Sequence, residues 1–338
     1  MVALRLEPVD EYTHEVGPEE NFNESMYFNV VDSRSGLGGF FRLANRPNEG
    51  QGEMTCCLWL PRRDHRRRVA FMFNRPDVDS NEAFDAGGMC FDVLEPFNRL
   101  EVSYDGKVVL LDDPNLLEDP RAAFRSNPWH DCEVRLTYTG LSPMYGGEPE
   151  DRDAALGDEF ARGHYEQLVA ARGVVRVGHQ EWPVDGYGLR DHSWGPRYWQ
   201  APWYYRWLTA NLGRDCGFMG SRIARRDGDG TRTGFGWEKG VLHPCDDFTL
   251  RTEWHPDRPH QAVVFAELRA GDRRWGITGY VESVVPLRNR RETPDGELLV
   301  TRIAEGLTRW ELDDGRTGWG LSEYLDQVVD GQPVGLAE

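Results

Sequence analysis

The sequence has no long hydrophobic run. None of its 338 residues belongs to an uninterrupted apolar stretch of the length that spans a membrane, and residues 1–7 contain no apolar run of signal-peptide length. We therefore expect a cytoplasmic protein that does not insert into membranes. The six cysteines are scattered and form no Cys-x-x-Cys pair, which predicts buried reduced thiols.

Positive charge is also in short supply. The chain has 39 Lys and Arg residues against 57 Asp and Glu residues, which gives a formal net charge of −18. A surface of this sign repels phosphate backbones and anionic lipid. We therefore expect a small molecule as the partner, and neither a nucleic acid nor a membrane surface.

Several catalytic motifs are missing as well. There is no His-Glu-x-x-His sequence, and His164, His179 and His192 do not have the spacing of metal ligands on one element, so we expect no metal. Ser193 lacks the glycine two residues earlier that a nucleophile elbow requires. The glycines at 228–236 join two predicted strands and open no helix, which indicates a hairpin turn rather than a nucleotide loop. We expect no cofactor.

Short β-segments separated by turn residues fill most of the chain. Asp105-Gly106 lies between two of these segments and predicts a two-residue hairpin. Strands at this spacing, with short turns between them, are typical of antiparallel sandwiches and barrels. The predicted fold class is therefore all-β.

A stretch rich in Gly, Pro and acidic residues, 140–153, suggests a domain boundary. We expect a β-domain over 1–150, a connecting helix within 151–171 and a second β-domain over 172–338. The helix is predicted for 154–171, where Leu156, Phe160 and Leu168 recur on one helical face. On such a helix His164 and Gln167 share a face, which suits a ligand role for His164 and equally a structural one at a helix–sheet contact.

The segment from Gly186 to Trp207 combines ionisable and aromatic side chains. Arg190, Asp191 and His192 supply charge and proton chemistry near neutral pH. Large rings surround them and provide apolar surface: Tyr187, Trp194, Tyr198, Trp199, Trp203, Tyr204, Tyr205 and Trp207. The combination predicts a pocket for a hydrophobic molecule with a polar or reactive end. The alternative is a barrel core with buried Trp and a structural Arg–Asp pair.

Strand geometry restricts this segment. Neighbouring residues of a regular strand face opposite sides, so Arg190, His192 and Trp194 share one face while Asp191 and Ser193 take the other. A bulge or bend at the glycines of this segment would bring Asp191 and His192 into one cavity. Without such a bend, one of the two is structural.

The motif Asp191-His-Ser-Trp-Gly195, preceded by Gly186-Tyr-Gly188, resembles the Asp-His-x-Trp-Gly element of a lipocalin-like superfamily. That superfamily contains AttH-like proteins and the carotenoid 1,2-hydratases, or hydroxyneurosporene synthases. The chain looks closer still to a bacterial branch with an Asn-x-Asn-Glu-Ser start (21–25), a His-Tyr-Glu-Gln element (164–167) and an Arg-Asp-His-Ser-Trp-Gly element (190–195).

The resemblance implies two lipocalin-like β-barrels with an apolar cavity at or near their junction. It also implies cofactor-free hydration, cyclisation or rearrangement of isoprenoid- or polyketide-like hydrophobes. Asp191, His192 and Trp194 match the superfamily element. Glu24, His164 and Arg197 match only the bacterial branch.

Two functions remain open from the sequence. The first is a cofactor-independent lyase or isomerase acting on a terpenoid- or steroid-like molecule, with Asp191 or His192 as the proton donor. Aromatic faces would stabilise a developing carbocation and tyrosines would donate hydrogen bonds; the residues concerned are Trp194, Trp199, Trp203, Tyr187 and Tyr204. The second is a non-catalytic carrier, in which Arg197 anchors the polar end of a lipophile.

Overall fold

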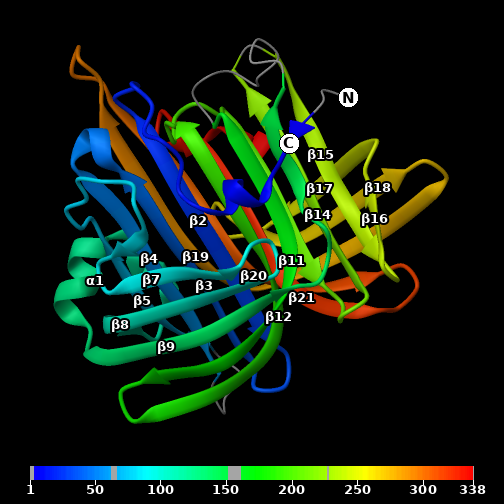
Figure 1. The fold of residues 1–338 in the computed structure, drawn as a ribbon, viewed down its shortest axis with the longest axis horizontal. Coiled ribbons are helices and arrows are strands. Elements are labelled where there is room, and N and C mark those ends of the chain that lie inside the picture. The colour runs from blue at the N-terminus through cyan, green and yellow to red at the C-terminus, as the bar shows by residue number, and fades with distance from the viewer. Residues whose placement is uncertain (1–3, 62–66, 151–160, 227, 338) are drawn as a thin grey trace. The chain divides into compact units, whose positions relative to one another are not determined.

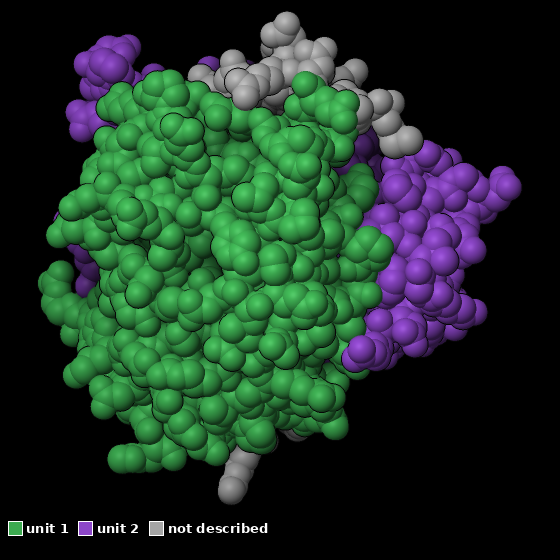
Figure 2. Space-filling view, viewed as in Figure 1, with its two compact units in different colours: residues 1–112, 124–198 green, residues 113–123, 199–338 purple. Residues whose placement is uncertain are grey.

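A computed structural model describes residues 4–61, 67–150, 161–226 and 228–337. Strands dominate it (Figure 1), and every pair of neighbouring strands among the described residues is antiparallel. The chain divides into two compact units, residues 1–112 with 124–198 and residues 113–123 with 199–338 (Figure 2). The predicted all-β class is confirmed.

The first unit contains one sheet. Its strands are β1 (Leu4–Arg5), β2 (Phe22–Asp32), β3 (Leu37–Arg46), β4 (Gln51–Leu60), β5 (Arg68–Asn74), β6 (Phe84–Ala86), β7 (Met89–Glu95), β8 (Arg99–Leu111), β9 (Trp129–Gly140), β10 (Tyr145–Pro149), β11 (Gly163–Val177) and β12 (Gln180–Pro196).

Eight of these strands close into a ring. Hydrogen bonding runs β11-β12-β2-β3-β4-β5-β8, and β9 pairs with both β8 and β11, which returns the ring to its start. Alternate residues of the strands point inward, such as Met26, Phe28 and Val30 of β2, and together they form a buried apolar core. The first unit is therefore a closed barrel, and a barrel of eight strands has an interior small enough for side chains to fill.

The second unit holds the other sheet. Its strands are β13 (Tyr204–Asn211), β14 (Cys216–Arg225), β15 (Gly228–Glu238), β16 (Val241–Pro244), β17 (Asp247–Trp254), β18 (Gln261–Ala270), β19 (Arg273–Glu292), β20 (Leu298–Leu312), β21 (Thr317–Val329) and β22 (Gln332–Pro333).

This second sheet is strongly curved. Its order is β16-β15-β14-β13-β21-β20-β19-β18-β17, with β22 added to β21. Phe248 of β17 packs so closely over Gly220 of β14 that a Cβ at this glycine would lie 2.5 Å from the ring. The two ends of the sheet therefore approach each other around a buried core that includes Leu208, Phe218 and Trp310.

Helices are short. The only α-helix of the described residues is α1 (Pro120–Ser126), and the 3-10 turns are η1 (Pro8–Glu11), η2 (Pro47–Glu49), η3 (Pro114–Glu118) and η5 (Val334–Ala337). Among the described residues no helix is long and apolar enough to cross a membrane.

The connecting helix predicted for 154–171 is wrong over its described part. Residues 163–171 belong to β11, while 154–160 lie outside the described residues. Strand β11 pairs with β12 along its whole length and with β9 over its second half, so the sheet satisfies its backbone on both edges. Sheet pairing therefore overrides the helical spacing of the apolar residues.

Two further predictions differ from the structure. Asp105-Gly106 forms no hairpin, because β8 continues through it and pairs with β9 on both sides of Gly106. Residues 172–198, assigned from the sequence to the second domain, belong to the first unit, because β12 pairs with β2 near the start of the chain. Residues 113–123, assigned to the first domain, belong to the second unit.

Candidate functional site

Strand β12 places Asp191 and His192 on opposite sides of the sheet. It is hydrogen-bonded to β11 on one edge and to β2 on the other through this region, so it has no room for a bend. His192 lies opposite Tyr165 and Met26, on the interior face, and Asp191 lies opposite Glu166 and Tyr27, on the outer face. The alternation expected from the sequence is confirmed, and the bend that would unite the two side chains does not form.

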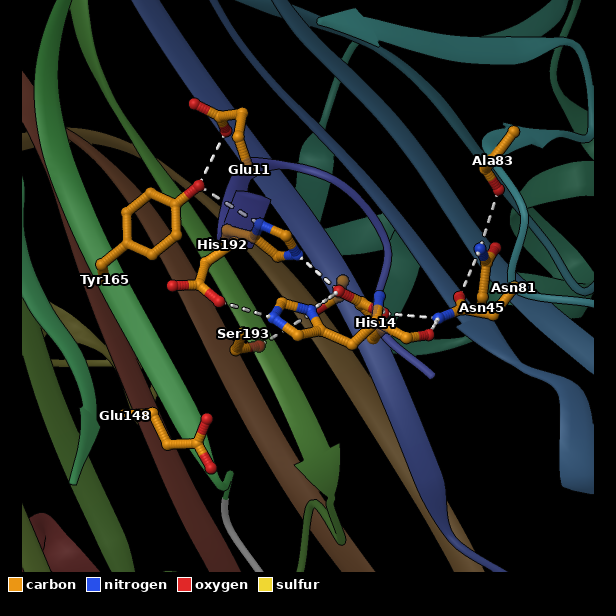
Figure 3. A network of polar contacts seen from close by, with 12 residues as sticks. Glu11, His14, Asn45, Asn81, Ala83, Glu148, Tyr165, His192 and Ser193 are labelled. Carbon is orange, nitrogen blue, oxygen red and sulfur yellow. Dashed lines mark hydrogen bonds and ion pairs between the residues drawn. The ribbon is translucent and has the colours of Figure 1, made fainter. Parts of the chain in front are cut away.

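The interior face carries a continuous polar network (Figure 3). The His192 ring is fully buried, with Nε2 2.8 Å from Oε1 of Glu24 and Nδ1 3.2 Å from the hydroxyl of Tyr165. The Tyr165 hydroxyl donates a hydrogen bond of 2.7 Å to Oε1 of Glu11. Both ring nitrogens of His192 are thus engaged inside the barrel.

Glu24 is the centre of this network. Its Oε1 is 2.6 Å from Nδ1 of His14 as well as 2.8 Å from His192, and its Oε2 accepts the backbone N–H of His14 and a side-chain N–H of Asn81. Burial on its own would raise the pKa of Glu24, but the hydrogen bonds from the two histidines lower it to about 2. Glu24 is therefore an ionised carboxylate in the barrel interior.

His14 is partly accessible to solvent, with 20% of its side chain exposed, whereas Glu24 is fully buried. Its Nε2 lies 3.3 Å from Oδ1 of Asp10, and its ring stacks on Trp194 with centroids 4.1 Å apart and planes at 13°. Burial opposes the charged form, but Glu24 and Asp10 raise the pKa of His14. Trp194, predicted to line a substrate pocket, is 2% exposed and packs inside this network.

A second buried charge pair lies beside the first group. Arg190 donates to both carboxylate oxygens of Glu11, at 2.6 and 2.9 Å, and to the side-chain oxygen of Gln167 at 2.9 Å. Both charged side chains are fully buried. The structural arginine pair considered from the sequence is therefore real, but the partner of Arg190 is Glu11 and not Asp191.

The outer face carries a smaller and more accessible group. Nε2 of His164 lies 3.9 Å from Oδ2 of Asp191 and 3.7 Å from Oε1 of Glu166. The side chains of His164 and Asp191 are 45% and 21% exposed. Desolvation lowers the pKa of His164, but the two carboxylates raise it by more. His164 and Asp191, predicted as site residues, are thus brought together here.

The remaining predicted residues of the first unit lie along the same part of the chain. Arg197 donates a hydrogen bond of 3.1 Å to the hydroxyl of Ser193, which is itself 3.1 Å from the hydroxyl of Ser25. Tyr187 of β12 and Tyr198 are half-buried. Arg197 therefore supports the outer-face hydroxyls next to Asp191.

Trp199, Trp203 and Tyr204 belong to the second unit. The guanidinium of Arg226 lies 4.6 Å from the ring centre of Trp203, and that of Arg206 lies 4.8 Å from Tyr204. Arginines therefore contact both rings, of which Trp203 was predicted to stabilise a carbocation and Tyr204 to donate a hydrogen bond.

A pocket of about 360 Å³ opens in the second unit. Its walls are mostly charged and include Glu238, Arg273, Asp313 and Arg316. None of the aromatic residues between 194 and 207 lines it, so it is not the aromatic pocket predicted from the sequence.

Sequence reasoning missed Glu11, His14 and Tyr165. Glu11 and His14 lie about 180 residues before His192, at the end of η1 and just after it, so no local spacing connects them to His192. Tyr165 was assigned to a helix together with His164, which concealed its register opposite His192. Strand pairing between β11 and β12 is the signal that would have identified it.

The Arg190–Glu11 pair generates a stability prediction. Glu11→Gln leaves the buried guanidinium without its counter-charge and should lower the free energy of unfolding by about 3–5 kcal/mol. The double variant Glu11→Gln/Arg190→Met should lose clearly less than the sum of the two single losses, because it removes both charges. Urea unfolding of the three variants measures this. A loss below about 1 kcal/mol for Glu11→Gln would show that the pair is not a buried charge pair.

The fold has relatives of known structure. An AttH-like protein from Nitrosomonas europaea is 14% identical with a TM-score of 0.56, and covers 96% of this chain and 97% of its own. Kievitone hydratase from Nectria haematococca is 8% identical with a TM-score of 0.55, covering 96% of this chain and 94% of its own. CghA crystallised with Sch210972 is 11% identical with a TM-score of 0.54, and the match covers 91% of this chain and 89% of CghA. The AttH-like fold inferred from the Asp-His-x-Trp-Gly motif is thus confirmed.

Comparison of sequences gives the family. No curated protein matches the chain significantly. The model of the family described as a domain of unknown function, DUF7064, matches residues 7–328, which is nearly the whole chain and includes Glu11, Glu24, His164 and the Asp191-His192 motif. The chain therefore belongs to the DUF7064 family.

Proposed function

We propose that the protein is a lyase or isomerase of the hydratase type, which acts on a hydrophobic terpenoid- or steroid-like small molecule by acid–base catalysis. The observation that carries this proposal is the outer-face pair of His164 and Asp191. A histidine whose pKa is raised lies beside a carboxylate, and both side chains are accessible to solvent.

The pair has complementary roles in a dehydration. The imidazolium of His164 donates a proton to the leaving hydroxyl, which departs as water, and the carboxylate of Asp191 accepts the proton from the adjacent carbon. Hydration is the same path in reverse. An isomerisation uses the two groups in the same way, with the proton returned to a different carbon of the substrate.

Solvent accessibility is the reason for choosing the His164–Asp191 pair, and not His192, as the proposed catalytic group. His192 is completely buried and both its ring nitrogens have partners within the barrel. Its motif neighbour Asp191 keeps a partly exposed carboxylate. We therefore assign the reacting proton to the outer face and give His192 a place in the interior network. The shared fold with an enzyme named kievitone hydratase supports chemistry of this type.

The first test is Asp191→Asn, which keeps the shape of the side chain and removes the carboxylate that accepts the proton. The rate should fall by about 10²–10⁴-fold while ligand affinity stays nearly unchanged. The melting temperature should change little, because the contact with His164 is long and partly exposed.

Turnover is measured on a panel of terpenoid and steroid alcohols and alkenes, as gain or loss of one water by mass spectrometry or as an isomer by chromatography. Asp185→Asn is the matched control, because Asp185 lies on the same strand and pairs only with surface arginines. If the panel compounds quench the tryptophan fluorescence of the wild-type protein but none of them is converted, the protein is a carrier and the proposal is wrong.

The second test is the pH dependence of the rate. In the dehydration direction His164 acts as the acid only while protonated, so the dehydration rate should fall as the pH rises through the raised pKa of His164. Asp191→Asn removes one of the anions that raise this pKa and should move the falling limb to lower pH. His164→Gln should abolish the limb. A limb that stays in place in His164→Gln belongs to another group.

A further inference from the structure

The interior network brings together three side chains of the types that bind transition metals. His14 comes from the segment after η1, Glu24 from β2 and His192 from β12. One ligand atom from each of them lies within 4.8 Å of the other two. Two imidazole nitrogens and one carboxylate oxygen form a donor set that occurs in zinc enzymes and in non-haem iron proteins.

The remote nitrogen of each histidine is already held by a hydrogen bond. Nε2 of His14 lies 3.3 Å from a carboxylate oxygen of Asp10. Nδ1 of His192 lies 3.2 Å from the Tyr165 hydroxyl, whose own proton is donated to Glu11 at 2.7 Å. With these partners both remote nitrogens can act as N–H donors. Metal-binding histidines show this pattern, with the second ring nitrogen donating to a carboxylate or another oxygen.

The inner nitrogens of both histidines face one oxygen of Glu24. Nδ1 of His14 and Nε2 of His192 lie 2.6 and 2.8 Å from Oε1 of Glu24, and the two ring centroids are 5.8 Å apart. A divalent cation between these three atoms would bind two imidazole nitrogens and one carboxylate oxygen. The remote ring nitrogens would not compete for it, because Asp10 and Tyr165 already engage them.

We propose that His14, Glu24 and His192 bind a divalent first-row transition metal ion of the Zn²⁺ type. The two nitrogen–oxygen distances of 2.6 and 2.8 Å must open by roughly half an ångström to accept metal–ligand bonds of about 2.0–2.2 Å. The ion fastens the N-terminal segment around His14 to strands β2 and β12. This site lies on the interior face of β12, so it does not depend on the outer-face chemistry proposed above.

The experiment begins with the whole wild-type protein. It is stripped with a chelator, dialysed, loaded with Zn²⁺ or Co²⁺ and measured for bound metal. We expect close to one equivalent, a visible absorption band of Co²⁺ in a low-symmetry nitrogen–oxygen site, and a higher melting temperature with metal than without. A stripped protein that takes up neither metal and melts at the same temperature in its presence overturns the proposal and leaves a hydrogen-bonded histidine pair.

Variants then assign the ligands. His14→Ala removes a ligand at the partly exposed edge of the site and should weaken Co²⁺ binding at least 100-fold, and Asp10→Asn should weaken it 10–100-fold by releasing the remote nitrogen. His179→Ala is the control, since His179 is an exposed histidine of the same unit and its loss should change nothing.

The outcomes separate the two proposals. If His14→Ala binds Co²⁺ as tightly as the wild type, the ion is elsewhere and the site is wrong, whatever the activity. Asp191→Asn should keep the metal and lose turnover. Failure of Asp191→Asn to lose turnover counts against the proposed function only.

Discussion

The alternation of side chains along β12 is the constraint on which the rest of the first unit depends. Because β12 is hydrogen-bonded on both edges through the Asp191-His192 motif, it cannot twist one of these residues to the other's side. The motif therefore serves two separate environments. Asp191 faces the outside with His164, and His192 faces the barrel interior with Glu24.

Buried charge determines what must surround the interior half of the motif. Arginine and glutamate side chains in an apolar barrel need partners whose hydrogen bonds and opposite charge offset the cost of desolvation. Arg190 takes Glu11, and Glu24 takes His14 and His192. Because Glu11 and His14 come from the start of the chain, folding of the N-terminal segment is tied to β12.

The sequence predicted those features that depend on local pattern. Turn residues and alternating strands identified the all-β class, and strand periodicity separated Asp191 from His192. The predictions from the sequence were wrong where pairing between distant strands determines the structure. Residues 163–171 have an apolar spacing that suits a helix, but β9 and β12 hold them in a sheet. Asp105-Gly106 has the composition of a hairpin, but β9 extends past it. Glu11 and His14 reach the site only through the tertiary fold.

The two faces of β12 differ in what they can do, and the difference is in access to water. On the interior face every ionisable group is held by partners within the barrel, so its charges are fixed and suit structure or ion binding. On the outer face the contact between His164 and Asp191 is 3.9 Å long and partly exposed, which is the access that the proposed proton exchange with a substrate requires. Fixing the first face makes the backbone of the second rigid, because both belong to one strand. The buried histidine therefore helps to hold Asp191, the aspartate proposed to be catalytic, in position.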